Sequence, residues 1–338
     1  MSSQCTTRST SSVGKGVMRV VVLGLGSIGM RHARNLRSLG VLELVGMDPD
    51  AERRARFASE MGGATVENLE AAIAVRPDLA IVASPNVFHV PQALACARAG
   101  VALLIEKPLG TDRSDVATLE AEVADRDLFV HVGSNWKFHP AFKTMKSLLE
   151  QGRIGKVVGA QVLAGQWLPD WHSWEDYRRG YSARRDLGGG VVFDSHELDY
   201  LTWLLGPAEA LVGFAVRTGV LETETEDVAG VCLRLASGAV ATLQLDYIQR
   251  ESRRRYHLTG AEGTIEWDLQ AASVNLYRAA EKRTHSIDCR TDDFNEMYVE
   301  QMRHVLDGVR SGVPPVTPLS HAATVLDLQL ALRATVAS

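Results

Sequence analysis

The first part of the chain alternates short apolar runs with segments of helical periodicity. Apolar runs bounded by turn residues are typical of parallel strands, because both faces of a parallel sheet are covered. Strands are predicted at 18–23, 42–47, 79–83, 102–105 and 129–132. Helices are predicted between them, at 68–75, 88–99 and 112–124. Strand alternating with helix predicts an α/β domain over residues 17–137, with a Rossmann-type, doubly wound parallel sheet.

The pattern changes at about residue 138. A helix at 140–151 precedes seven strand-like runs, at 157–163, 210–217, 228–235, 239–248, 256–258, 264–268 and 274–277. Most of these runs follow one another without an intervening helix, which is typical of an antiparallel sheet. Three more helices are expected, at 191–205, 294–310 and 319–334. Residues 138–338 are therefore predicted to form an α/β domain with an open, mostly antiparallel sheet.

Composition narrows the class of protein. Residues 1–16 are rich in Ser and Thr and lack an apolar segment, so a disordered leader is expected there. No apolar run approaches the roughly 18 residues of a membrane span. The net charge of −5 gives no reason to expect a nucleic acid or membrane partner. The four cysteines lack metal-binding spacing, which predicts no metal site and fits a cytoplasmic protein, with Cys96 and Cys232 buried in apolar runs.

A glycine motif, Gly24-Leu25-Gly26-Ser27-Ile28-Gly29, lies between the first predicted strand and a helical segment. The first glycine suits a tight turn, the second a close approach of the backbone to a pyrophosphate, and the third the packing of helix on strand. The helix N-terminus then offers free N–H groups to the phosphates. This segment is predicted to bind a dinucleotide.

Asp48 ends the second predicted strand, where a carboxylate can hydrogen-bond the ribose hydroxyls and repel a 2′-phosphate. NAD is therefore the expected cofactor. NADP is the alternative, because Arg53 or Arg54 could meet a 2′-phosphate.

Four further segments, together with the glycine motif, carry a family resemblance; they are 83–89 (ASPNVFH), Glu106-Lys107-Pro108, 188–199 (GGGVVFDSHELD) and 260–265 (GAEGTI). The chain resembles the glucose-fructose oxidoreductase / inositol dehydrogenase / rhizopine catabolism (Gfo/Idh/MocA) family from about Met18 to its C-terminus. The resemblance implies cofactor contacts from Ser84, Pro85, Asn86, His89, Glu106, Lys107 and Asn135. It also implies that residues 138–338 bind the substrate and join copies of the chain as a dimer or tetramer.

The resemblance places the catalytic groups at Lys107 and His196. An ammonium at a strand end can stabilise a developing alkoxide, and an imidazole can accept the hydroxyl proton. A solvated surface lysine and a core or helix-capping histidine are the alternative interpretations. The carboxylate that partners His196 is left open between Asp194 and Asp199, because the first lies only two residues from the histidine.

A segment rich in tryptophan and arginine follows the first strand of the second domain. Aromatic rings cover the apolar faces of sugars, and arginines bind carboxylates or phosphates in bidentate fashion. The candidate substrate residues are Trp167, Trp171, Tyr181, Arg184 and Arg185. The alternative is a loop packed at a subunit interface. The run Arg253-Arg254-Arg255 is expected to be a solvated strand edge.

The predicted function is an NAD(P)-dependent oxidoreductase that interconverts a secondary alcohol and a ketone on a sugar, sugar acid or nucleotide-sugar. Two alternatives remain at this point. One is a non-catalytic, NAD-binding regulator on the same fold, and the other is a dehydrogenase of the same family acting on a non-sugar substrate.

Overall fold

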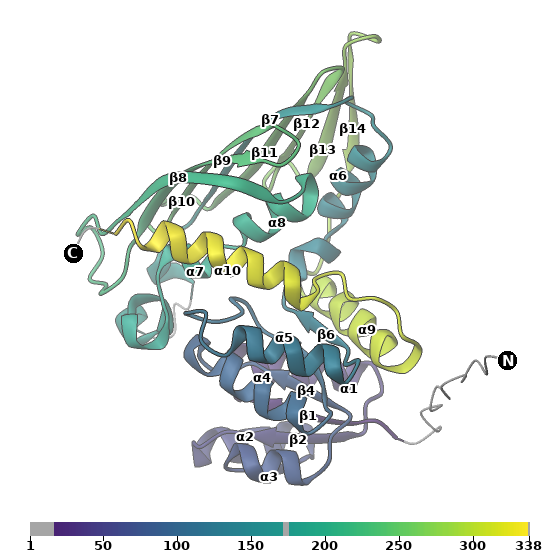
Figure 1. Ribbon diagram of the computed structural model, residues 1–338, viewed down its shortest axis with the longest axis vertical. Helices are drawn as coiled ribbons and strands as arrows, with labels where there is room; N and C mark the ends of the chain where they lie inside the picture. Colours follow the sequence, from purple (N-terminus) through teal and green to yellow (C-terminus); the bar gives the residue numbers. More distant parts are fainter. Residues whose placement is uncertain (1–16, 172–175, 337–338) are drawn as a thin grey trace, which may run out of the picture.

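The computed structural model describes residues 17–171 and 176–336, so the predicted leader lies outside the described residues. Its first sheet contains β1 (Arg19–Leu23), β2 (Glu43–Met47), β3 (Ala64–Val66), β4 (Leu79–Val82), β5 (Ala102–Ile105) and β6 (Val130–Val132). All pairs are parallel and the order is β3-β2-β1-β4-β5-β6. This confirms the predicted doubly wound sheet, whose carboxyl edge faces the second domain (Figure 1).

The helices of this domain are α1 (Ser27–Ser38), α2 (Ala51–Met61), α3 (Leu69–Ala74), α4 (His89–Arg98) and α5 (Val116–Asp125). The sequence pattern missed α2 and β3. Helix α2 buries only Phe57, so it lacks the apolar stripe by which an amphipathic helix is recognised. Its start is instead fixed by Asp50, whose carboxylate accepts hydrogen bonds from the first-turn amides.

The second sheet has eight strands in the order β14-β13-β12-β11-β7-β10-β9-β8. They are β7 (Val157–Gly165), β8 (Ala208–Val216), β9 (Val228–Leu235), β10 (Val240–Asp246), β11 (Arg253–Gly260), β12 (Gly263–Asp268), β13 (Ser273–Arg278) and β14 (Arg283–Asp288). Only β7 and β10 pair in parallel, which confirms the mostly antiparallel prediction. The sequence pattern missed β14, an edge strand without a fully buried residue.

One face of this sheet is covered by α6 (Pro140–Glu150) and α8 (Glu197–Leu205) (Figure 1). The other face exposes apolar side chains, including Val212, Phe214 and Val240. Cys232 also lies exposed on β9, so the prediction that it is buried was wrong, whereas Cys96 is buried as expected. An apolar run on an alternating strand does not reveal which positions face the covered side. In the part of the chain that the structure describes, no helix is long and apolar enough to cross a membrane.

The last two helices return to the first domain. Helix α9 (Glu296–Ser311) adds Met302 and Leu306 to the core on one face of the parallel sheet. Helix α10 (Leu319–Arg333) adds Leu319 and Leu326 to the core on the other face, and it runs between the two domains in Figure 1. These contacts fix the two domains relative to each other and so position the cleft between the sheets.

Candidate active site

The glycine motif forms the turn between β1 and α1. Gly24 has φ +93°, a left-handed conformation that favours glycine. A Cβ on Gly29 would lie 1.9 Å from the Gly24 carbonyl oxygen, so only glycine allows this close packing of helix on turn. A Cβ on Gly26 would meet nothing within 4 Å. Because Gly26 has no Cβ, the space beside its backbone stays open for a ligand.

This turn fits a dinucleotide. Helix α1 is capped by Gly26 without a side-chain hydrogen bond, which leaves the first-turn amides, including those of Ser27 and Ile28, without an intrahelical acceptor. Asp48 follows β2 at the same edge of the sheet and accepts a hydrogen bond from the Leu25 amide at 2.8 Å. The phosphates and the ribose of NAD require donors and a carboxylate in this arrangement.

The segment after β4 braces the two domains. The Asn86 side chain donates to the Gly188 carbonyl oxygen at 3.0 Å. The His89 ring is 1% exposed and lies between the carbonyl oxygens of Ser84 and Pro108. Burial lowers the pKa of His89. His89 therefore holds this loop, which includes Pro85, to the Lys107-Pro108 turn.

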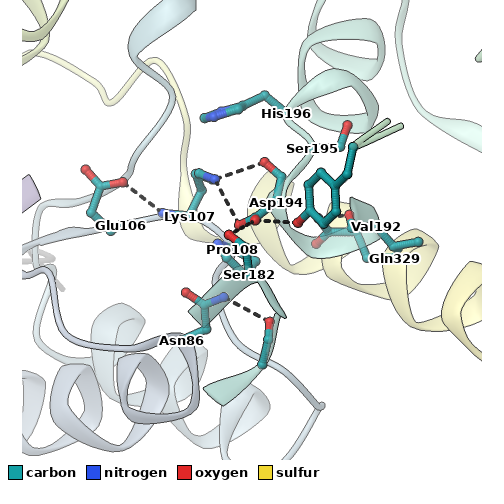
Figure 2. A network of polar contacts seen from close by, with 12 residues as sticks. Asn86, Glu106, Lys107, Pro108, Ser182, Val192, Asp194, Ser195, His196 and Gln329 are labelled. Atoms are coloured by element: carbon teal, nitrogen blue, oxygen red, sulfur yellow. Dashed lines mark hydrogen bonds and ion pairs between the residues drawn. The ribbon is translucent and has the colours of Figure 1, made fainter. Parts of the chain in front are cut away.

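The Glu-Lys-Pro tripeptide follows β5 and points to the second domain. Glu106 contacts the buried His32 ring of α1 at 2.6 Å. Lys107 Nζ donates to the Asp194 carbonyl oxygen at 2.9 Å and lies 3.8 Å from Asp194 Oδ1. Figure 2 shows the lysine side chain directed at Asp194, with His196 nearby. The lysine is thus held by a partner in the other domain.

Asp194 is the last residue of the short helix α7 (Val191–Asp194) and is buried. Its Oδ2 accepts hydrogen bonds from Ser182 and from the Tyr247 hydroxyl. Its Oδ1 has no hydrogen-bond partner among the described residues. Burial and the neighbouring Asp194 carboxylate raise the pKa of Tyr181 and of Tyr247 well above their usual value. Both phenols therefore stay protonated and can donate.

His196 immediately precedes α8. Its Nδ1 lies 2.8 Å from the Tyr200 hydroxyl, and the two rings stack at 5.3 Å. Burial lowers the pKa of His196 well below its usual value, and the charges of Lys107 and Arg254 lower it further. The ring is therefore neutral near pH 7. No described residue bonds Nε2, which leaves this nitrogen for a ligand.

Asp199 belongs to a different cluster. Its Oδ1 lies 2.7 Å from both the Lys137 ammonium and the His321 ring, and its Oδ2 accepts from Ser134. Although burial acts to raise the pKa of Asp199, the Lys137 charge and the hydrogen bond from His321 hold it at about 2. The residue therefore ties α8 to α10 and to the end of the first domain.

Neither aspartate bonds the His196 ring; Asp194 adjoins Lys107, and Tyr200 is the histidine's partner. Asn135, expected near the nicotinamide, donates to Met297 Sδ at 3.2 Å and so faces α9.

A cavity of about 250 Å³ opens between the domains at Lys107, Asp194 and His196. Trp171 also lines it, with its ring edge-on to Tyr247 at 5.4 Å. Arg253 and Arg254 line it as well, so the expectation that this run is only a solvated strand edge was wrong. The third residue of the run, Arg255, is exposed and pairs with Asp268.

The other substrate candidates are more scattered. The Trp167 ring lies under the Arg250 guanidinium at 3.5 Å. Arg184 pairs with Asp186, and Arg185 donates to the Glu224 carbonyl oxygen; both arginines lie outside the residues that line the cavity. The exposed ion pair of Arg184 with Asp186 contributes little to stability.

Sequence reasoning missed residues that surround the predicted ones; these are Ser182, Glu197, Tyr200, Tyr247 and Arg254. Tyr200 was the easiest of them to predict from the sequence, because it lies four residues after His196 and so faces it across one helical turn. Tyr247 directly follows β10 and Arg254 lies on β11, so their place depends on strand register, for which the sequence carries no local signal. In the ranges 17–171 and 176–336, no group of three or more acidic, His or Cys side chains could hold a metal ion.

Comparison with known proteins agrees with this arrangement. Residues 18–134 match the model of the Gfo/Idh/MocA oxidoreductase family with an NAD-binding Rossmann fold, and residues 142–266 match a Gfo/Idh/MocA C-terminal domain. An inositol 2-dehydrogenase of Corynebacterium glutamicum is 30% identical over 308 residues, which cover 87% of this chain and 86% of the relative. A myo-inositol 2-dehydrogenase of Thermotoga maritima is 27% identical over 88% of this chain and 90% of the relative.

A solved oxidoreductase from Agrobacterium radiobacter, in complex with NAD+, L-tartaric acid and magnesium, shares the fold with a TM-score of 0.84. It is 18% identical, and the match covers 95% of this chain and 96% of that one. The predicted Rossmann domain and family resemblance are confirmed. The chain belongs to the Gfo/Idh/MocA family of NAD-binding oxidoreductases.

Proposed function

We propose that this protein is an NAD-dependent dehydrogenase that interconverts a secondary alcohol and a ketone on a sugar, sugar acid or nucleotide-sugar. The observation that carries the proposal is that Lys107 and the free Nε2 of His196 share one cavity at the carboxyl edge of the parallel sheet. Ligands of doubly wound sheets bind at this edge. Relatives named inositol 2-dehydrogenase support a polyhydroxylated ring as substrate.

The cofactor would be held by the backbone at Gly24, Gly26, Ser27, Ile28 and Gly29, by Asp48 at the adenosine ribose, and by the loops at Ser84, Pro85, Asn86 and Glu106. When bound, the nicotinamide ring accepts or returns the hydride. His89 and Asn135 act by bracing these loops, because both side chains are engaged within the protein.

Lys107 would hold the reacting oxygen. Its ammonium has one strong partner, the Asp194 carbonyl oxygen, and so retains N–H donors for the substrate. As the carbinol loses its hydride, the ammonium stabilises the negative charge that develops on oxygen. Asp194 lines the same cavity, and its buried Oδ1 lies 3.8 Å from Lys107 Nζ, so the carboxylate helps to hold the ammonium in place.

His196 would accept the hydroxyl proton at Nε2. A neutral imidazole carries one N–H, and in the tautomer with this proton on Nδ1 the ring donates to the Tyr200 hydroxyl and keeps its lone pair on Nε2. Because burial and the nearby cations lower the pKa of His196, the ring is deprotonated and competent as a base near neutral pH.

Purified enzyme incubated with NAD and a panel of inositols, hexoses, uronates, nucleotide-sugars, non-sugar alcohols and imines tests the proposal. We expect NADH formation with at least one polyol, and loss of that signal in Lys107→Met. NAD binding without turnover of any substrate would favour the regulator alternative. Turnover confined to a non-sugar alcohol or imine would favour the second alternative.

We also propose that the open face of the second sheet joins copies of the chain as a dimer or tetramer. Val212 and Phe214 on β8 are 70% and 71% exposed, and Val240 continues the apolar surface on β10. Large exposed apolar patches mark interaction surfaces, and identical chains associate through such patches by symmetry. Light scattering should give a mass of two or four chains for the wild type and a smaller mass for Phe214→Glu. A monomeric wild type would overturn this assembly.

A further inference from the structure

Arg254 lines the cavity and is held in place by neighbouring side chains, but it has no role in the proposed reaction. It lies on β11, its side chain is 18% exposed, and it lines the same cavity as Lys107 and His196. Its guanidinium lies 4.5 Å over the Trp136 ring. Its Nε is 2.8 Å from an oxygen of Glu197, whose side chain is fully buried. The Trp136 ring against its face and the Glu197 carboxylate beside Nε therefore hold the guanidinium in one orientation.

The end of the guanidinium is not used by the protein. Arginine has five N–H donors, and the nitrogen nearest to Glu197 is Nε, which forms an ion pair with Glu197 Oε1 without the geometry of a hydrogen bond. Within the described part of the chain, no residue accepts a hydrogen bond from Nη1 or Nη2. Glu197 is itself occupied, because its other oxygen accepts from the Ser195 hydroxyl and the His196 amide. Arg254 thus offers the donors of Nη1 and Nη2 to the cavity that Lys107 and His196 also line.

We infer that Arg254 binds a carboxylate on the same sugar unit that carries the reacting carbinol. The inference rests on the proposed function, and it makes the preferred substrate a sugar acid rather than a neutral sugar. A planar guanidinium binds a carboxylate through two parallel hydrogen bonds, which a lysine cannot reproduce. A single cavity of about 250 Å³ keeps a group bound at Arg254 close to the carbon between Lys107 and His196.

The neighbouring arginine on the strand supplies a matched control. Arg255 points to the opposite side of β11, is exposed, and pairs with Asp268 at 3.0 Å. It has the same charge and the same strand environment as Arg254 but does not line the cavity. An effect of net charge is therefore shared by Arg254→Met and Arg255→Met, whereas effects on substrate recognition and on the buried Glu197 are confined to the first.

The experiment compares substrate pairs that differ only in a hydroxymethyl or a carboxylate group, both as free sugars and as nucleotide-sugars. NADH formation gives kcat/KM, and calorimetric titration of the NAD-loaded enzyme gives affinity without turnover. We expect the wild type to favour the carboxylate member of a pair. Arg254→Met should lower kcat/KM and affinity for the carboxylate member by about 10- to 100-fold more than for the neutral member. Arg254→Lys should restore only part of the loss, and Arg255→Met should keep the wild-type ratio.

Because Arg254→Met leaves a buried carboxylate unpaired, the double variant Glu197→Gln/Arg254→Met serves as a second test, with the same expected loss of preference. The inference is overturned if the wild type binds both members equally, if it binds no carboxylated sugar, or if Arg254→Met keeps the preference. It is also overturned if Arg254→Met removes only a preference for the nucleotide-linked forms. A carboxylate preference in titration without NADH formation would instead leave the inference standing and contradict the proposed function.

Discussion

The cofactor half and the substrate half of this site are built in different ways. The first uses the backbone of one short segment, residues 24–29, at the start of α1. The second collects side chains from distant segments, and Lys107, Asp194 and Arg254 meet only because two domains pack together. Alterations of the first half should therefore act on dinucleotide affinity, whereas alterations of the second should act on turnover and substrate choice.

Lys107→Met should produce the largest effect. Loss of the ammonium that stabilises the alkoxide is expected to lower kcat/KM by about 10³-fold. The affinity for NAD, measured by titration, should stay within about threefold, because the lysine belongs to the substrate half. Lys143→Met, which removes an exposed lysine on α6, is the control. An equal loss of NAD affinity and turnover would erase the distinction between the halves.

Asp199→Asn should separate structure from catalysis. The substitution leaves the Lys137 ammonium buried without a charged partner, which is expected to cost about 3 kcal/mol or more of unfolding free energy. Asp194→Asn, in contrast, should lower kcat/KM with a smaller loss of stability. Denaturant unfolding and steady-state kinetics of both variants test this assignment. Full stability of Asp199→Asn would remove the residue from the interdomain cluster.

The same aspartate predicts a pH dependence of stability. Its pKa is about 2 in the folded protein and 3.8 ordinarily, so the folded state binds fewer protons. Its stabilising contribution, about 2 kcal/mol, is complete above pH 4 and is lost as the pH falls towards 2. Unfolding of the wild type and of Asp199→Asn over this range should converge at low pH. A constant difference between the two curves would contradict the shifted pKa.

Gly26→Ala should have the smallest effect and should sharpen the definition of the cofactor half. The added methyl group meets no protein atom within 4 Å, so the fold should tolerate it. It would occupy the space left for the pyrophosphate and lower NAD affinity by about 5- to 100-fold. Gly29→Ala, whose methyl group would lie 1.9 Å from the Gly24 oxygen, should instead destabilise the domain. Unchanged NAD affinity in Gly26→Ala would show that the dinucleotide binds elsewhere.

The difference between the halves also explains what the sequence could predict. The glycine spacing and Asp48 identify the dinucleotide turn because local backbone geometry demands those residues. Most strands were predicted because their apolar patterns are strong, while α2 and β14 bury too little to leave such a pattern. The place of Arg254 depends on which face of β11 is turned to the cleft, and a one-residue change of register reverses that. The role of Asp199 depends on how α10 crosses between the domains, because His321 lies on that helix. The role of Asp194 depends on the approach of Lys107 from the other domain.

Transfer of isotope tests the central claim most directly. A sugar acid carrying deuterium at the reacting carbon is incubated with the enzyme and NAD, and the cofactor is analysed by mass spectrometry. The account predicts deuterium in the reduced nicotinamide for the wild type and, at equal NAD occupancy, loss of that transfer in Lys107→Met. The account would be contradicted if no polyol or sugar acid transferred its label to bound NAD, or if the Lys107→Met enzyme transferred it as fast as the wild type.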